Sequence, residues 1–221
     1  MDIVQQLLPA FLVGARNTLI YCIASFPLAL LLGLILALMA NSRVTWFRVP
    51  ARTFIEIIRA TPILAQMFIL YYGLGTLLAN YGLVNLDNSW SAGIAALALN
   101  YAAYEAEVYR AGFLSVDRGQ SEAALSLGLT SGQNFFHIVL PQAVPLMIPP
   151  FVNDFIYMLK DSAVLSAIAG AELTGVLIFW SIRDVSNPLP LYAMAMVLYL
   201  VLSLPASYLA RLLERRLRAA L

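Results

Sequence analysis

Charged residues are scarce in this chain, and two reactive residue types occur only once. Charged residues make up 11% of the 221 residues, whereas a soluble domain typically carries about 25%. The single cysteine, Cys22, lies in an apolar stretch, so one chain can form neither a disulfide nor a cysteine-based metal site. The single histidine, His137, lies in a polar stretch, and we expect a surface residue rather than a metal ligand or a catalytic base.

The sequence also lacks a nucleotide-binding loop. Its only lysine, Lys160, follows Leu159, so the GK[ST] sequence of a Walker A loop cannot be written. We therefore expect no enzyme and no cofactor bound by this chain. The net charge of +1 gives no indication of a nucleic-acid partner, and none is expected. Because the first charge is Asp2 rather than a basic cluster, we expect no signal peptide.

Long uncharged runs dominate what is present. Apolar residues make up 62% of the chain, and about 20 consecutive apolar residues suffice to cross a membrane. The patterns predict an all-α integral membrane protein, with one membrane domain over residues 1–221 and a short lead at 1–16. The five expected transmembrane helices are 17–42, 60–86, 90–114, 138–159 and 188–210. Residues 162–182 are interrupted by Gly170, Glu172 and Gly175, which favours a broken or partly re-entrant segment at the outer mouth.

Basic residues predict the orientation, because cytoplasmic loops carry an excess of lysine and arginine. They gather in three regions: Arg43, Arg48, Arg52 and Arg59; Arg110 and Arg118; and Arg211, Arg215, Arg216 and Arg218. With five spans, all three regions fall on one side. The C-terminus is then cytoplasmic, and the N-terminus and the connection 80–89 lie outside. A sixth span at 162–182 would move the basic tail outside.

The stretch 122–141, EAALSLGLTSGQNFFHIVLP, has the pattern of two helices joined by a glycine turn. Thr130 and Gln133 have the spacing of a capping box, and Gly128 can end the preceding helix in a left-handed conformation. Pro141 suits the first turn of the next long helix. The exposed apolar residues expected here are Leu125, Leu127, Phe135 and Phe136. Such a surface indicates a protein partner, although an amphipathic loop lying on lipid headgroups would show the same pattern.

This stretch resembles the EAA loop of binding-protein-dependent ABC import permeases. The residues that match are Glu122, Ala123, Ala124, Gly128, Ile138, Leu140 and Pro141. The resemblance implies a type I ABC importer permease fold in the bacterial cytoplasmic membrane, with a cytoplasmic coupling loop at about 115–141. It also implies three protein partners: a separate ATPase that binds ATP and magnesium, an external solute-binding protein, and a second permease chain that is identical or homologous.

A second set of segments resembles permeases for polar amino acids. These segments are 57–73 (IIRATPILAQMFILYYG), 104–128 and 158–168 (MLKDSAVLSAI). The departures are Ala60 for the usual glycine, Asp154 where glutamate is common, and Ser162-Ala163 for the usual Thr-Ser or Ser-Ser. The resemblance implies an importer that moves amino acids by alternating access.

Ionisable residues within the spans are costly in hydrocarbon and usually face a cavity or a partner. Asp154 and Asp161 are seven residues apart and share one helix face, with Asn153 and Tyr157 beside them. This face could hold an ammonium or guanidinium group. Alternatively, Asp161 pairs with Lys160 or with a helix terminus, and Asp154 bonds to a neighbouring helix. Further substrate-binding candidates are Thr61 and Gln66, and Arg59 either faces the same cavity or marks the inner membrane surface.

Glu107 and Arg110 have the spacing of a structural ion pair on a helix.

Two classes of function remain open at this point. The leading class is the membrane subunit of an ATP-driven amino-acid importer. The alternatives are an ion-coupled secondary transporter or channel, with Asp154 and Asp161 as an ion site, and an importer permease for another small solute. The stretch 122–141 favours the first class, because an ion-coupled carrier has no use for a helix that docks an ATPase.

Overall fold

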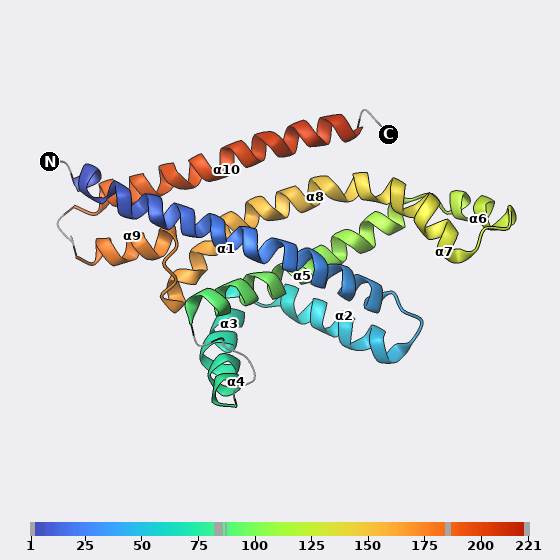
Figure 1. The fold of residues 1–221 in the computed structure, drawn as a ribbon, viewed down its shortest axis with the longest axis horizontal. Helices are drawn as coiled ribbons and strands as arrows, with labels where there is room; N and C mark the ends of the chain where they lie inside the picture. Colours follow the sequence, from blue (N-terminus) through green and yellow to red (C-terminus); the bar gives the residue numbers. More distant parts are fainter. Residues whose placement is uncertain (1–2, 82–85, 87, 184–186, 219–221) are drawn as a thin grey trace.

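The computed structural model describes residues 3–81, 86, 88–183 and 187–218, and all regular elements in these ranges are helical (Figure 1). Four long helices extend along the molecule: α1 (Ile3–Ala40), α5 (Ser89–Ser115), α8 (Leu140–Asp161) and α10 (Leu189–Arg218). α1 packs against α5, and α8 packs against α5 and α10. The N-terminal end of α1 lies at one end of the molecule, and the C-terminal end of α10 points toward the other (Figure 1).

Small residues bring α1 and α5 close together. A buried cluster joins Ala37 and Ala40 of α1 to Ala103 and Ala106 of α5. At Gly33 of α1, an added Cβ atom would lie only 2.7 Å from a side-chain atom of α5. Interfaces of membrane helices are rich in small residues for this reason, since van der Waals packing replaces the hydrophobic effect in lipid.

A sharp bend at the start of the predicted second span separates it from the helix before it. α2 (Thr45–Ala60) and α3 (Ile63–Phe68) meet at an angle of 113°. The bend falls at Thr61 and Pro62, both with extended backbone, because a residue before proline avoids the α-conformation. The chain continues through η1 (Ile69–Gly75) and α4 (Thr76–Asn80), which project from the long helices (Figure 1).

Two predicted boundaries were wrong. The lead at 1–16 was expected outside the first span, but α1 begins at Ile3 and runs through Pro9. The basic connection at 41–52 was left between the first two predicted spans, but most of it belongs to α2, whose buried face carries Ala51 and Ile55. Both segments were misread because their polar residues mask a helix that has an apolar side. Residues 82–85 of the predicted second span lie outside the described residues.

Three helices in the described part of the chain are long and apolar enough to cross a membrane: Val4–Ala40, Ser131–Ile168 and Leu189–Arg216. The bent pair Thr45–Ala60 and Ile63–Leu78 makes a fourth if it is counted as one span. α5 has 27 residues and is therefore about 40 Å long, enough to cross. α5 is not among the three apolar helices because it carries polar residues, which include Asn100 and Glu105.

The predicted break after the fourth span is present. The chain forms a 3₁₀ helix, η3 (Ser162–Ile168), then passes through Ala169 in a left-handed conformation with φ of 57°. α9 (Leu173–Ser181) follows, and its N-cap residue is Glu172, whose carboxylate accepts hydrogen bonds from the backbone of Thr174 and Gly175. This segment lies beside the first half of α1 (Figure 1).

Candidate functional site

A polar cavity of about 300 Å³ lies between the α2–α3 bend, α5 and α8. Its lining residues are Thr61, Pro62, Ile63, Asn100, Tyr101, Tyr104, Asp154, Tyr157 and Asp161. Two carboxylates therefore face one small volume, as their spacing on α8 predicted. No lysine or arginine is among these lining residues, so the charged side chains that line the cavity are both acidic.

Asp161 is held by α5 rather than by its neighbour in the sequence. The hydroxyl group of Tyr101 donates to Asp161 Oδ2 over 2.7 Å. The Nζ atom of Lys160 lies 4.5 Å from the centre of the Tyr157 ring, a cation–π contact. The predicted alternative of an Asp161–Lys160 pair is therefore not what the structure shows.

Asp154 also lines a second cavity, of about 480 Å³, on the side toward the C-terminal end of α5. Tyr104 is the other residue that both cavities share. Arg59, Glu107 and Arg110 line the second cavity as well. The two spaces therefore meet at Asp154 and Tyr104, between the bend and the end of α5.

An ion cluster lines the second cavity. Glu107 Oε2 lies 2.6 Å from Arg110 Nη2 and 3.9 Å from Arg59 Nη1. The predicted Glu107–Arg110 pair is thus present. The guanidinium group of Arg59 also lies 5.6 Å from the centre of the Tyr104 ring. Arg59 therefore links the last turn of α2 to α5, next to the place where the two cavities meet.

Only some of the predicted substrate-binding residues line the first cavity. Asp154, Asp161, Tyr157 and Thr61 line the first cavity. Asn153 is exposed and is not among the lining residues of either cavity. Gln66 lies behind the lining, where its amide bonds to Asn100 and to the backbone at the bend.

The α5 side of the cavity was missed by the sequence reasoning. Asn100, Tyr101 and Tyr104 supply one wall. Their spacing in the sequence NYAAY, at 100, 101 and 104, places them on one helix face, and this was the signal that could have identified them. Glu105, one residue further on, turns away toward α1 and is completely buried.

The stretch 122–141 forms the helical turn that the sequence predicted. α6 (Arg118–Ser126) ends in a Schellman motif, in which Gly128 N–H bonds to Leu125 O and Leu129 N–H to Ala124 O. Gly128 has φ of +88°, a conformation that residues with side chains rarely adopt. α7 (Ser131–Asn134) then begins with the complete capping box of Thr130 and Gln133.

The second helix of this turn is not a separate short helix. α7 continues through the π-helical turn η2 (Phe135–Val139) into α8, so that one helix extends from Ser131 to Ile168. Pro141 has no N–H to donate to the preceding turn, and a π-helical turn accommodates such a gap. Phe135 packs against Phe113 of α5, with ring centres 5.4 Å apart, and is less exposed than expected.

The surface of this turn is apolar and unusually open. Leu127 is 82% exposed, Phe136 64% and Leu125 47%. Glu122 and Ala123 are exposed beside them, and Ala124 is the buried residue of α6. His137 lies on the surface, as expected, but it belongs to η2 rather than to a loop, and its ring is bonded to Gln133 O. α6 and α7 form the tip of the molecule at the end opposite the N-terminus (Figure 1).

Residues 29–219 match the family of binding-protein-dependent transport system inner membrane components. The chain belongs to this family. This permease is therefore a multi-pass protein of the bacterial inner membrane and not the ATPase of its transport system. Membership also implies a complex with an ATPase and a binding protein. The resemblance drawn from 122–141 is confirmed.

Similar proteins align over nearly the full length of the permease. A probable amino-acid ABC transporter permease protein (y4tG) of Sinorhizobium fredii is 37% identical over 209 residues, covering 95% of this chain and 87% of that protein. The octopine transport system permease protein OccM of Rhizobium radiobacter is 38% identical over 215 residues, covering 95% and 86%. The crystal structure of an amino acid ABC transporter with histidines is 36% identical, with a TM-score of 0.87, covering 98% and 99%.

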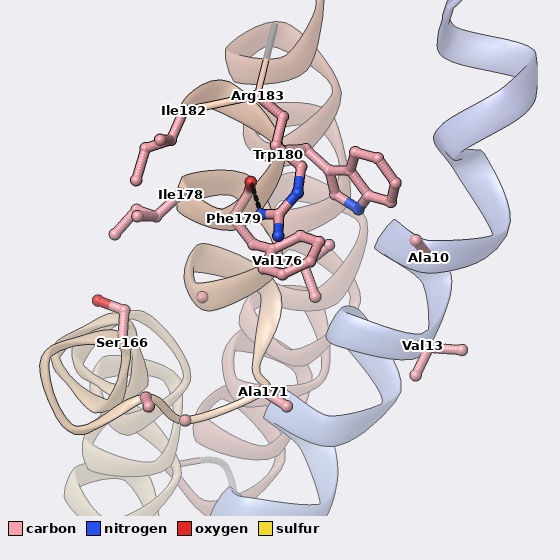
Figure 2. A pocket seen from close by; sticks show the side chains of 13 residues that line it. Ala10, Val13, Ser166, Ala171, Val176, Ile178, Phe179, Trp180, Ile182 and Arg183 are labelled. Carbon is pink, nitrogen blue, oxygen red and sulfur yellow. Dashed lines mark hydrogen bonds between the residues drawn. The ribbon is translucent and has the colours of Figure 1, made fainter.

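A third cavity of the permease, of about 610 Å³, lies near the N-terminal end between α1, η3 and α9 (Figure 2). Its lining is mostly apolar, with Val13, Ile178 and Ile182 among the residues. Arg183 supplies the one charged side chain in this lining, and it folds back onto α9. Its Nη1 atom donates to Phe179 O over 2.9 Å, and its guanidinium group stacks on the Phe179 ring. This cavity is larger than the polar ones but offers little to a polar solute.

Proposed function

We propose that the permease translocates polar amino acids and that the substrate binds in the cavity between Asp154 and Asp161. The two carboxylates of this cavity carry the proposal. A carboxylate on a membrane-spanning helix needs water, a cation or a hydrogen-bond donor. Every amino acid brings an ammonium group, and a basic amino acid brings a second cation. The lining therefore suits a zwitterionic or cationic substrate better than an acidic one.

Relatives support this class of substrate. The Sinorhizobium fredii protein and the solved transporter are both described as amino-acid transporters. The Rhizobium radiobacter protein OccM belongs to an octopine transport system. The second cavity, with Arg59 and Glu107, continues from the first toward the end of the molecule that carries α6 and α7. Substrate would leave the site by this route.

The proposed membrane topology has five spans, formed by α1, the bent pair of α2 and α3, α5, α8 and α10. The basic residues near the ends of α1, α5 and α10 then lie in the cytoplasm together with α6 and α7. The N-terminus and α9 lie outside, where a solute-binding protein would deliver the substrate.

The proposed mechanism couples ATP binding to alternating access. Two permease chains, identical or homologous, enclose the pathway, and each presents the surface around Leu127 and Phe136 to a cytoplasmic ATPase that binds ATP and magnesium. Glu122, Ala123, Ala124, Gly128, Ile138, Leu140 and Pro141 are the proposed coupling residues. Closure of the ATPases would move these helices together and open the cavity outward, because ATP binds the closed state more tightly.

Reconstitution tests the proposal. The permease is placed in proteoliposomes with its ATPase and solute-binding protein, and ATP hydrolysis and the uptake of labelled arginine, glutamine and glutamate are measured. We expect ATP-dependent uptake of arginine or glutamine and weaker uptake of glutamate. Uptake that follows a sodium or proton gradient without ATP would overturn the mechanism, and transport of none of the three amino acids would overturn the substrate class.

A further inference from the structure

Gln66 occupies an unusual position behind the wall of the substrate cavity. Its Nε2 atom lies 2.8 Å from Ile58 O, 3.0 Å from Thr61 O and 2.9 Å from Thr61 Oγ1. The last carbonyl groups of a helix have no partner within it, and at membrane depth an unpaired carbonyl is costly. Gln66, from the first turns of α3, therefore satisfies the end of α2 across the 113° bend.

These contacts decide which way the amide of Gln66 points. A backbone carbonyl can only accept a hydrogen bond, so the NH₂ group of Gln66 must face Ile58 and Thr61. Its Oε1 atom is left on the other side, where it accepts from Asn100 Nδ2 over 2.9 Å. The orientation of the Asn100 amide is fixed in turn, because only its NH₂ group can donate to Oε1.

Asn100 is the residue through which the orientation of Gln66 affects the cavity. It is 4% exposed and belongs to the cavity lining, whereas Gln66 does not. With its NH₂ group directed at Gln66, Asn100 has its carbonyl oxygen left for the substrate. Asp154 and Asp161 already provide acceptors there, and Tyr101 donates its hydroxyl hydrogen to Asp161.

We propose that Gln66 is a positioning residue for substrate specificity, which fixes the amide of Asn100 so that the cavity gains a third hydrogen-bond acceptor for a cationic amino acid. Gln66 acts without touching the substrate. The inference rests on the proposed amino-acid transport. It adds that the carbonyl groups at the end of α2 orient the Gln66 amide, and that the Gln66 amide in turn orients the Asn100 amide at the substrate site.

Arginine uptake by the assembled transporter tests the relay. Gln66→Met keeps the length of the side chain but frees Asn100 to rotate, and we expect KM for arginine to rise about tenfold, as for the loss of one hydrogen bond to a cationic group. In an Asn100→Leu background, Gln66→Met should then change KM no further, because its effect passes through Asn100. If Gln66 only stabilises the fold, the KM changes caused by Gln66→Met and Asn100→Leu should instead add in the double variant.

Gln142→Met is the matched control. Gln142 of α8 also donates its amide to a backbone carbonyl, Ile138 O, at 3.0 Å, but it lines neither polar cavity. We expect its KM for arginine to equal that of the wild type. Should Gln66→Met fail to assemble, Asn100→Leu alone tests the third acceptor: we expect its KM for arginine to rise about tenfold, and an unchanged KM overturns the proposal.

An unchanged KM in Gln66→Met, or additive effects in the double variant, overturns the positioning role and leaves amino-acid transport intact. Absence of arginine, glutamine and glutamate uptake in the wild type overturns the proposed function itself.

Discussion

Asp154 is the carboxylate at which the two polar cavities meet. In an Asp154→Asn variant the shape is preserved and the negative charge is lost. We expect uptake of arginine to fall about tenfold or more, the effect of losing a charge-assisted contact, while membrane insertion and basal ATP hydrolysis stay unchanged. Uptake over a range of arginine concentrations, protein amount and ATPase rate measure the three quantities.

The control for this variant is Glu56→Gln, which removes a carboxylate from the exposed part of α2, outside both polar cavities. Normal uptake by Asp154→Asn would show that Asp154 is structural, and the substrate would have to bind elsewhere.

Replacing each of two glutamates of α5 by glutamine should shift the Tm of the permease in opposite directions. Glu105 is completely buried against α1, and neither carboxyl oxygen has a hydrogen-bond partner among the described residues. Glu107 is half-buried and bonded to Arg110. A buried carboxylate without a partner is costly, so Glu105→Gln should raise the Tm of the solubilised permease by about 2–4 °C.

Glu107→Gln removes the anion from the ion cluster and should lower the Tm. Thermal unfolding, followed by fluorescence at one pH, gives the Tm of both variants. A lower Tm for Glu105→Gln would show that the carboxyl group makes a stabilising contact in the assembled membrane protein.

Spacing along one helix predicted part of these arrangements. Asp154 and Asp161 on one face, and Glu107 beside Arg110, follow from helical periodicity within the sequence. The difference between Glu105 and Glu107 does not, because it depends on Gly33 of α1, which reaches α5 only through the fold. Gln66 was placed in the pocket for the same reason: its partners at the bend and on α5 could not be read from its own segment.

The helices themselves were predicted best where apolar residues run without interruption. α10 and the break after α8 follow the sequence pattern closely. α2 was missed because four charged residues interrupt its sequence, and only two of its side chains are buried. The π-helical turn before Pro141 was also missed, since a proline usually indicates a new helix rather than a continuous one.

Gly128 provides a test of the turn between α6 and α7. Gly128→Asp places a side chain at φ of +88°, which costs about 1–3 kcal/mol of strain and should disturb the docking surface. We expect weaker co-purification of the ATPase and a loss of transport, with normal insertion of the permease. Pull-down of the ATPase and uptake of arginine measure both effects.

Gly132→Asp is the matched control, because it adds the same charge four residues away at a helical position with equally open surroundings. Its transport should remain near that of the wild type, since an acidic residue suits the first turn of a helix. Equal losses in the two variants would attribute the effect to charge instead of backbone strain, and normal ATPase binding by Gly128→Asp would exclude the coupling role.

At the scale of the molecule, the placement of basic residues agrees with the proposed five-span topology. Arginines follow α1 and α5 in the sequence and occupy the last turns of α10, and α6, α7 and the end of α10 are directed toward the same end of the molecule (Figure 1). The opposite end carries the start of α1, α9 and a mostly apolar cavity (Figure 1 and Figure 2). Five crossings are the number that separates the termini while keeping all three basic regions on one side.

Cysteine labelling tests this orientation directly. The only native cysteine, Cys22, is completely buried, so Cys22→Ala gives a background without a reactive thiol. Asn187→Cys lies before α10 and Leu127→Cys at the turn after α6, both exposed. In intact cells without the ATPase, a membrane-impermeant maleimide should label Asn187→Cys alone, and permeabilised cells should show labelling of both. Labelling of Leu127→Cys from outside would reverse the topology, and the surface around Leu127 could then not meet a cytoplasmic ATPase.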